Sequence, residues 1–372
     1  MANAGDAITV GIACSVTGRY GHPGAQVLAG VQAWVEDTNR RGGMGVGARR
    51  PVRLVHHDDQ SKLDRCASLV ERLITKDRVD ILLGPYSSGL AMAAARAARR
   101  HRRVMWNHSG ALDGINKAGG GWAVSVLSPA STYFHGVVAL VMETSAPVRS
   151  VAIVHSTAGE FPREVASGAE RYCRERGIEP ITTLRYGVGT TDFGPVVERI
   201  ETERPDLLMG VGRIGDDIRL AQALRGAGEV AGAIGLIVTP LTLFKDTLGD
   251  AAEGFLGPSQ WEPGVVAVPD YGPSPQQVAE SLSARSPAGV DYPMAQAYAG
   301  CLVAQRCAEE TATLEDAALR DAAHGLDFTT FYGRFRTDST GRQVGHKMPV
   351  VQWRGGEKVV VWPRELASGR GS

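Results

Sequence analysis

The chain has 372 residues, of which 43% are hydrophobic and 22% charged, ordinary values for a globular protein. Its 40 Lys and Arg residues balance its 40 Asp and Glu residues, so the charge favours neither nucleic acid nor an anionic membrane as a partner. The apolar runs are far shorter than the roughly 20 residues of a membrane-spanning helix, and the opening MANAGDA is too short and polar for a signal peptide. We therefore expect no transmembrane segment, and an export signal that was either removed or never present.

The first third of the chain alternates predicted strands and helices. Strands are predicted at residues 7–13 and 52–57, with a helix at 24–39 between them that stops before Gly42 and Gly43. Ser61 and Asp64 are spaced as a capping box for the next helix. This strand–helix order predicts a doubly wound parallel sheet.

Residues 79–112 carry the clearest binding-site pattern. A short apolar run ends at Gly84-Pro85, Ser87 and Ser88 then open an alanine-rich helix, and the strand at 104–106 ends at Asn107. A right-handed crossover places both turns at the carboxyl edge of one sheet, where open α/β sheets bind ligands. Hydroxyls and free N–H groups at a helix N-terminus suit a carboxylate, although Ser87 and Ser88 could also be a simple helix cap. The pattern contains no catalytic group.

A second α/β unit is predicted to begin near residue 129. Strands at 151–155, 181–185, 207–211 and 236–238 alternate with helices at 163–176, 192–203 and 216–227. An irregular stretch, two helices and closing strands at 334–337, 350–353 and 359–361 follow. We therefore predict an α/β protein with two doubly wound, Rossmann-like lobes.

Three features suggest other chemistry. Residues 210–215, GVGRIG, are a literal GxGxxG between a strand and a helix, but the next strand ends in Thr239-Pro240, with no acidic residue for a ribose. The run His56-His57-Asp58-Asp59 could suggest a metal site, but neighbouring residues on a strand point to opposite faces. The five cysteines show no CxxC spacing and are expected to be buried. We expect no metal, no cofactor and no enzyme, and an NAD(P)-dependent enzyme using GVGRIG remains an alternative. The arginines at 96–103 predict a solvated helix face or a partner contact.

Several segments, taken together in their order, resemble type I periplasmic binding proteins, specifically the leucine/isoleucine/valine-binding receptors of ABC transporters. They are ITVGIACSVTGRYG, NRRGG, GPYSSG, VAIVH, GDAAEG and FYGRFRTDSTG with VVQW. The resemblance runs from Ile8 to about Pro363. It implies two lobes joined by three crossovers, with residues 7–126 and 258–327 in lobe one, 127–257 and 328–363 in lobe two, and a disordered tail at 364–372.

The resemblance also implies ligand positions. Ser88 resembles the serine that holds the ligand carboxylate, and the turn at 109–111 resembles the one whose backbone groups hold the ligand's polar ends, with Ala111 in place of the usual hydroxyl. Tyr20 resembles an aromatic residue that covers the ligand. In lobe two, Phe161 or its neighbour Glu160 falls near another aromatic position. The predicted ligand-binding set is Tyr20, Ser87, Ser88, Trp106, Ser109, Gly110, Ala111, Glu160, Phe161, Arg213 and Tyr292.

Some of these positions have simpler interpretations, and one expected partner is missing. Tyr20 and Tyr292 could be surface aromatics, Trp106 could be core, and Arg213 could be a solvated loop residue. The acidic residue that usually pairs with a ligand ammonium should lie near residues 238–242, which read VTPLT. We therefore expect a ligand other than a plain branched-chain amino acid, and Arg213 would suit a second anionic group.

The predicted function is a solute receptor that closes two lobes around a small polar ligand, an amino acid or a related carboxylate, for an ABC permease. Its location would be the periplasm or cell surface if a signal was removed, and otherwise the cytoplasm. A cytosolic amide or amino-acid sensor acting on a regulatory partner is the alternative within the same fold.

Overall fold

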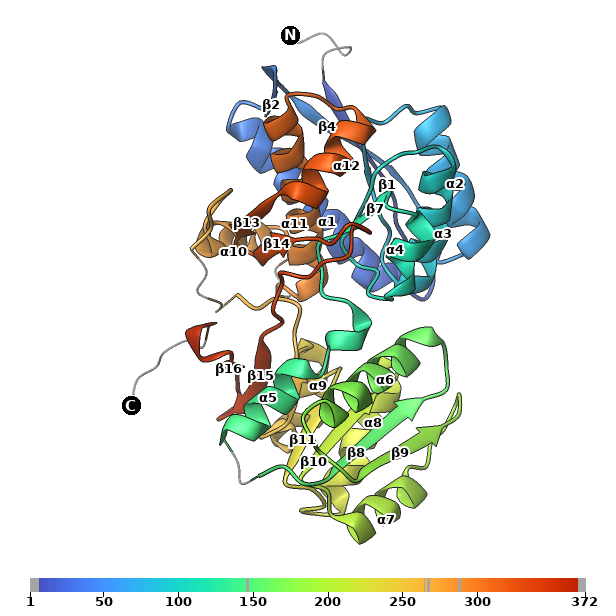
Figure 1. Cartoon of the computed structure of the whole chain (residues 1–372), viewed down its shortest axis with the longest axis vertical. Coiled ribbons are helices and arrows are strands. Elements are labelled where there is room, and N and C mark those ends of the chain that lie inside the picture. The colour runs from blue at the N-terminus through green and yellow to red at the C-terminus, as the bar shows by residue number, and fades with distance from the viewer. Residues whose placement is uncertain (1–6, 145–146, 264, 266–267, 287–288, 367–372) are drawn as a thin grey trace. The chain divides into compact units, whose positions relative to one another are not determined.

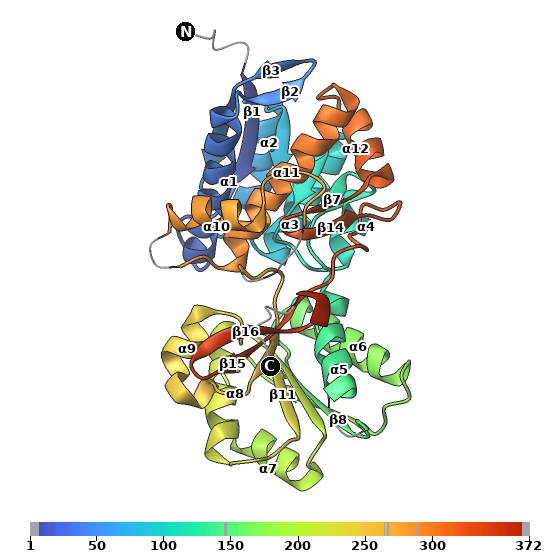
Figure 2. The same cartoon turned by 90° about the vertical axis from the view of Figure 1, so that its left-hand side faces the viewer.

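The computed structural model describes residues 7–144, 147–263, 265, 268–286 and 289–366 (Figures 1 and 2). The chain divides into two compact units. Unit 1 comprises residues 1–129 and 267–347, and unit 2 comprises 130–266 and 348–372. The chain therefore changes unit at 129/130, 266/267 and 347/348. The main sheet is parallel in unit 1 and mostly parallel in unit 2, and helices pack on both sheets, which confirms the predicted α/β class.

Unit 1 is built on a parallel sheet whose strands, in spatial order, are β4 (Val52–His57), β1 (Ile8–Ala13), β5 (Ile81–Leu83), β6 (Met105–Asn107) and β7 (Ala123–Ser125). Every residue of β1, β5, β6 and β7 is buried, as expected for strands covered on both faces. One group of mutually packed helices is α2 (Leu63–Thr75), α3 (Ser88–Arg100) and α4 (Gly114–Gly119). The other is α1 (Gly21–Arg40), α10 (Pro275–Ser283), α11 (Tyr292–Thr311) and α12 (Asp316–Gly325).

The contact between α1 and α11 shows why the second group packs closely. A Cβ atom at Gly30 would lie 2.1 Å from the carbonyl oxygen of Met294, so only glycine permits this backbone approach. One turn further along α1, Trp34 is fully buried and its indole N–H donates to Gln305 of α11 at 3.0 Å. A small residue and a large aromatic one thus join segments far apart in the sequence.

Unit 2 is built on a mixed sheet in the order β9 (Ile181–Tyr186), β8 (Val151–Ser156), β10 (Leu207–Val211), β11 (Ala233–Leu236), β12 (Leu256–Pro258), β15 (Val350–Arg354) and β16 (Glu357–Trp362). The last two strands are antiparallel additions to a parallel sheet. In Figure 2, α5 (His135–Thr144) and α6 (Glu160–Arg174) lie on one side of the sheet, and α7 (Gly194–Glu203), α8 (Ile214–Gly226) and α9 (Thr242–Leu248) lie on the other. Leu208, Leu220 and Phe244 belong to the buried cluster that joins α7–α9 to the sheet.

The boundaries between the units differ from the predicted ones. Residues 328–347 belong to unit 1, because the hairpin of β13 (Asp327–Thr330) and β14 (Gly333–Arg336) supplies aromatic residues to its core. Phe331 packs edge to face on Tyr298 of α11 at 5.5 Å. Residues 258–266 belong to unit 2, where β12 pairs with β15. Of the predicted disordered tail, 364–366 form a short 3-10 helix and the rest lies outside the described residues.

The predicted capping box at the start of α2 is wrong. The helix begins after Lys62, and no side chain caps it. Ser61 has a φ of 60°, outside the geometry of a helix cap, and its hydroxyl serves another purpose. It accepts from the N–H of Tyr20 at 3.0 Å and donates to the carbonyl of Thr17 at 2.9 Å. Ser61 therefore ties the segment after β4 to the loop after β1.

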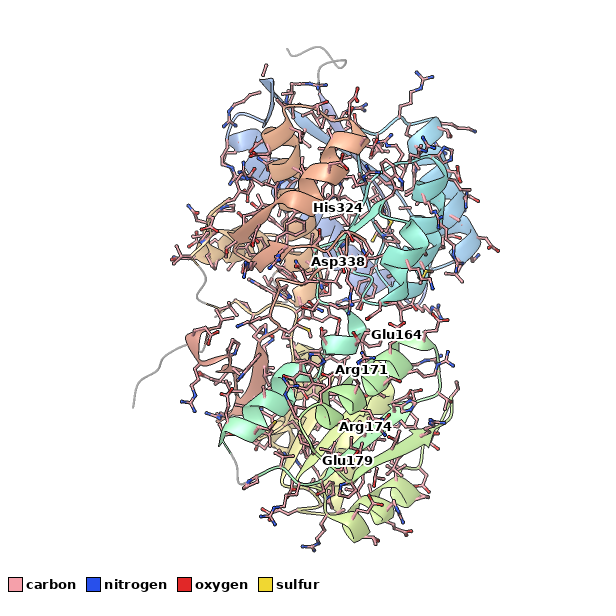
Figure 3. The ribbon with its side chains drawn as sticks, in the orientation of Figure 1. Glu164, Arg171, Arg174, Glu179, His324 and Asp338 are labelled. Atoms are coloured by element: carbon pink, nitrogen blue, oxygen red, sulfur yellow. The ribbon has the colours of Figure 1, made fainter. Side chains whose placement is uncertain are left out.

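Several charged side chains on the surface form ion pairs. In unit 2, Arg174 contacts Glu179 at 3.8 Å and Glu170 at 2.5 Å (Figure 3). Within the arginine-rich end of α3, Arg100 pairs with Glu71 at 2.5 Å, and just beyond the helix Arg103 pairs with Asp316 at 2.7 Å. The basic run is thus partly neutralised by neighbouring helices.

All five cysteines are buried and unbridged, as predicted. No helix of the described residues combines the length and apolar character that crossing a bilayer requires. In the same part of the chain, no three His, Cys, Asp or Glu side chains gather as metal ligands.

Candidate functional site

Unit 1 brings the two turns singled out in the sequence to one edge of its sheet. Strands β5 and β6 pair in parallel, with Leu83 opposite Trp106. The turns that follow them, residues 84–88 and 108–112, therefore lie side by side at the carboxyl edge, as predicted. This is the edge at which open α/β sheets bind their ligands.

Ser88 joins these two turns. Its hydroxyl oxygen accepts from the backbone N–H of Ala111 at 3.1 Å and from that of Leu112 at 3.3 Å. The hydroxyl proton of Ser88 is left to donate, because both of these bonds use the oxygen as acceptor. Within the described part of the chain, the N–H groups of Ser88 and Gly89 have no acceptor, since they belong to the first turn of α3. Three donors thus gather at the positive end of a helix.

Ser87 is the cap of that helix. Its hydroxyl accepts from the N–H of Leu90 at 3.4 Å, so the capping interpretation is correct for this residue. Its φ of 87° and ψ of 144° lie in a region that favours glycine. The strained turn places the first N–H groups of α3 beside the second turn.

The second turn is held closed by its own side chains. The Asn107 amide donates to the carbonyl of Gly110 at 2.7 Å and accepts from the N–H of Gly110 at 2.9 Å. Ala91 and Ile115 lie against Gly110, where an added Cβ would come within 2.4 and 2.6 Å of their side chains. The N–H groups of Gly110 and Ala111 therefore bond within unit 1, the second of them to Ser88. The Ser109 hydroxyl lies 2.7 Å from the Nδ1 atom of His108.

Three tyrosines lie near the first turn. Tyr20 and Tyr86 pack edge to face with 5.9 Å between ring centroids, and the Tyr86 hydroxyl bonds to that of Tyr292. All three are half-buried, and Arg19 lies over the Tyr20 ring at 4.5 Å. Burial raises the pKa of Tyr86 above its ordinary value, so the phenol stays neutral. Tyr86 was missed in the sequence, although it stands directly before Ser87 in the GPYSSG turn.

Trp106 does not join this group. Its side chain lies on β6 and the residue has no exposed surface, so the core interpretation fits this residue and it offers no surface to a ligand in this structure. The apolar strand end supports the turns from beneath.

The residues predicted in unit 2 lie at the carboxyl ends of its own paired strands β8 and β10. Glu160 is exposed at the start of α6, and Phe161 is half-buried and packs edge to face on Tyr133 at 5.3 Å. Arg213 is exposed at the position directly before α8.

The glycines of GVGRIG have a packing role. A Cβ atom at Gly212 would lie 1.8 Å from the hydroxyl of Tyr186 and 2.9 Å from Oδ1 of Asp217. Asp216 and Asp217, both buried, occupy the first turn of α8. Burial, and next the neighbouring Asp216, raises the pKa of Asp217. The N-terminal turn of α8, where a dinucleotide would bind its pyrophosphate, therefore contains two carboxyl groups of the chain itself.

Comparisons with known proteins agree with this architecture. Residues 7–358 match a family described as periplasmic binding protein. The chain is 23% identical over 357 residues to the Leu/Ile/Val-binding protein BraC3 of Rhizobium johnstonii, covering 95% of this chain and 93% of that one.

Solved structures of low sequence identity share the fold. A putative branched-chain amino acid ABC transporter protein from Silicibacter pomeroyi superposes with a TM-score of 0.84 at 17% identity, covering 98% of both chains. A solute-binding protein of R. palustris, solved with 4-hydroxybenzoate, gives 0.77 at 20% identity, covering 96% of both chains.

Proposed function

Because this chain belongs to the periplasmic binding protein family, we propose that it is a solute receptor of an ABC transporter and that unit 1 holds the carboxylate of a small ligand. The observation that carries this proposal is the donor cluster at the start of α3. The N–H groups of Ser88 and Gly89 and the hydroxyl of Ser88 converge there, and the first turn of the helix contains no acidic residue. An anion at such a helix end gains both hydrogen bonds and the field of the helix dipole.

The tyrosine group extends the proposal to the rest of the ligand. Tyr20, Tyr86 and Tyr292 offer ring faces and hydroxyls, a combination that suits an apolar or aromatic body with a polar tip. Among the relatives, one is named for Leu, Ile and Val and another was solved with 4-hydroxybenzoate. We therefore propose an amino acid or a related carboxylate, aromatic acids included.

The residues of unit 2 support a ligand other than a plain branched-chain amino acid. The described residues 238–242 contain no carboxylate, and the buried Asp217 is turned into the packing beneath the GVGRIG loop. The exposed Arg213 would face an anionic group if it contacts the ligand. Phe161, or Glu160 in its place, would add a contact from α6.

The proposal also covers partners and location. The receptor would deliver its ligand to an ABC permease from the periplasm or the cell surface, and it would not act as an enzyme. The alternative, a cytosolic amide or amino-acid sensor, shares the fold and differs in location, so fractionation of the native cells distinguishes the two.

The test is thermal unfolding with a panel of branched-chain and aromatic amino acids, benzoate, 4-hydroxybenzoate, amides and NAD(P)H. A ligand at about 100 times its Kd adds about 2.7 kcal/mol of stability, which raises the Tm by several degrees. Stabilisation by a carboxylate that falls by about half or more in Ser88→Ala but persists in the control Ser87→Ala supports the proposal. Stabilisation by NAD(P)H alone would instead make GVGRIG the binding site.

A further inference from the structure

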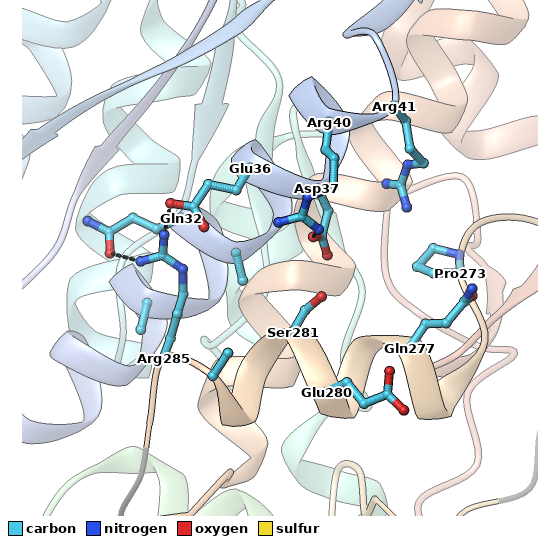
Figure 4. A pocket seen from close by; sticks show the side chains of 13 residues that line it. Gln32, Glu36, Asp37, Arg40, Arg41, Pro273, Gln277, Glu280, Ser281 and Arg285 are labelled. Carbon is cyan, nitrogen blue, oxygen red and sulfur yellow. Dashed lines mark hydrogen bonds and ion pairs between the residues drawn. The ribbon is translucent and has the colours of Figure 1, made fainter.

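A second polar cavity lies in unit 1, between α1 and α10 (Figure 4). Its volume is about 850 Å³, near the upper end of the range for small-molecule sites. It shares no residue with the turns at 84–89 and 107–111 or with the three tyrosines. The groove is therefore separate from the carboxylate site proposed above, and a ligand in it would be a second ligand.

Small residues create the space. Ala29 and Ala33 on α1, and Ser281 and Ala284 on or just after α10, line the groove without filling it. Larger apolar side chains at these positions could fill the space between α1 and α10, as Trp34 fills the space between α1 and α11. The groove is instead a cavity lined by these small residues and by charged side chains.

Two ion pairs fix the rim. Arg285 pairs with Glu36 and donates to Gln32 at 3.1 Å, which links the end of α10 to α1. Asp37 pairs with Arg40 at 2.8 Å and also accepts from the buried Tyr298 hydroxyl at 3.0 Å. These contacts neutralise four of the charged groups that line the groove.

The two remaining charges have opposite signs and lie on different helices. Arg41, at the end of α1, lies beside the Tyr298 hydroxyl, and Glu280 on α10 accepts from Gln276 at 3.0 Å. Among the residues that the structure describes, neither has an ion-pair partner within 4 Å. Ser281 and the Gln277 amide add neutral hydrogen-bonding groups along the α10 wall. The matching ligand has no net charge and carries an anionic group at one end and a cationic group at the other.

We propose that this groove binds a short zwitterionic peptide, with its carboxylate at Arg41 and its ammonium at Glu280. The small floor suits short side chains, and the open rim suits weak binding. Each contact is an exposed ion pair, so losing one should weaken binding about two- to fivefold.

The experiment titrates trialanine into the full chain and follows the backbone amides of α1 and α10 by NMR. N-acetyl-trialanine lacks the ammonium, and trialanine amide lacks the carboxylate. Glu280→Gln should weaken trialanine and the amide but not the acetylated peptide. Arg41→Gln should weaken trialanine and the acetylated peptide but not the amide. Arg96→Gln and Glu229→Gln, exposed charges elsewhere, are the matched controls.

Three results would overturn the proposal. One is the absence of saturable shifts in the α1 and α10 amides at millimolar trialanine. Another is that both variants weaken the binding of all three peptides equally, which would mean that neither Arg41 nor Glu280 contacts a charged peptide terminus. The third is loss of these shifts in Ser88→Ala, which would assign them to the other site of unit 1. Binding at the groove that survives Ser88→Ala leaves the proposed function to be judged by its own test.

Discussion

Replacing Ser88 by alanine tests the bond between the two turns of unit 1. The substitution leaves the N–H groups of Ala111 and Leu112 without their acceptor, and these residues are only 5% and 6% exposed, so water replaces it poorly. At about 0.5–1.5 kcal/mol for each net hydrogen bond, unit 1 should lose about 1–3 kcal/mol of unfolding free energy. Losing the hydroxyl donor to a carboxylate should also weaken ligand binding about tenfold or more.

The assay is urea unfolding followed by tryptophan fluorescence, with ligand titration of the folded protein. Trp34 and Trp106 are buried in unit 1 and report on its unfolding, which can differ from that of unit 2. Ser87→Ala is the neighbouring control, because it removes a single bond of 3.4 Å and should cost less than about 1 kcal/mol. If Ser88→Ala were as stable as Ser87→Ala and bound the ligand equally well, the bridging role of Ser88 would be wrong.

Three further predictions concern single residues in the two units. Burial lowers the pKa of His108 to about 4 from 6.5, so the unfolded chain binds the imidazole proton more readily than the folded chain. The free energy of unfolding should therefore fall by about 3 kcal/mol in total as the pH drops through this interval. Urea unfolding of His108→Gln across the same interval should show a shallower pH dependence, and an unchanged slope contradicts the assignment. Gly212→Ala places its Cβ 1.8 Å from the Tyr186 hydroxyl and should destabilise unit 2, with partial rescue by Tyr186→Phe in thermal unfolding; additive losses would rule out this contact. Ser87→Gly relieves the strained φ of 87° and should raise the unfolding free energy by about 1 kcal/mol, and a loss measured by urea unfolding would count against strain at this turn.

The sequence predicted the features that depend on neighbouring residues. The alternation of strands and helices and the two turns at 84–88 and 108–112 follow from periodicity and turn chemistry, and both turns lie at the predicted edge of the sheet. Contacts between distant segments were not predictable in this way. Ser61 looked like a cap but bonds to the loop after β1, because its positive φ turns it away from α2. The hairpin at 327–336 belongs to unit 1 because its aromatic residues meet α11, which no local pattern reveals.

The starts of α3 and α8 show how similar topology gives different chemistry. Both helices follow a parallel strand, so each directs its positive end at the carboxyl edge of its sheet. At α3 the first turn has no acidic residue and the N–H groups of Ser88 and Gly89 have no acceptor in the described chain. At α8 the first turn, at the positive end of the helix dipole, contains Asp216 and Asp217, both buried. Gly212, before this helix, is packed against Tyr186. The first turn of α8 is thus occupied by the chain's own carboxyl groups, whereas the start of α3 presents only donors, which supports the proposal that unit 1 holds the ligand carboxylate despite the glycine-rich motif of unit 2.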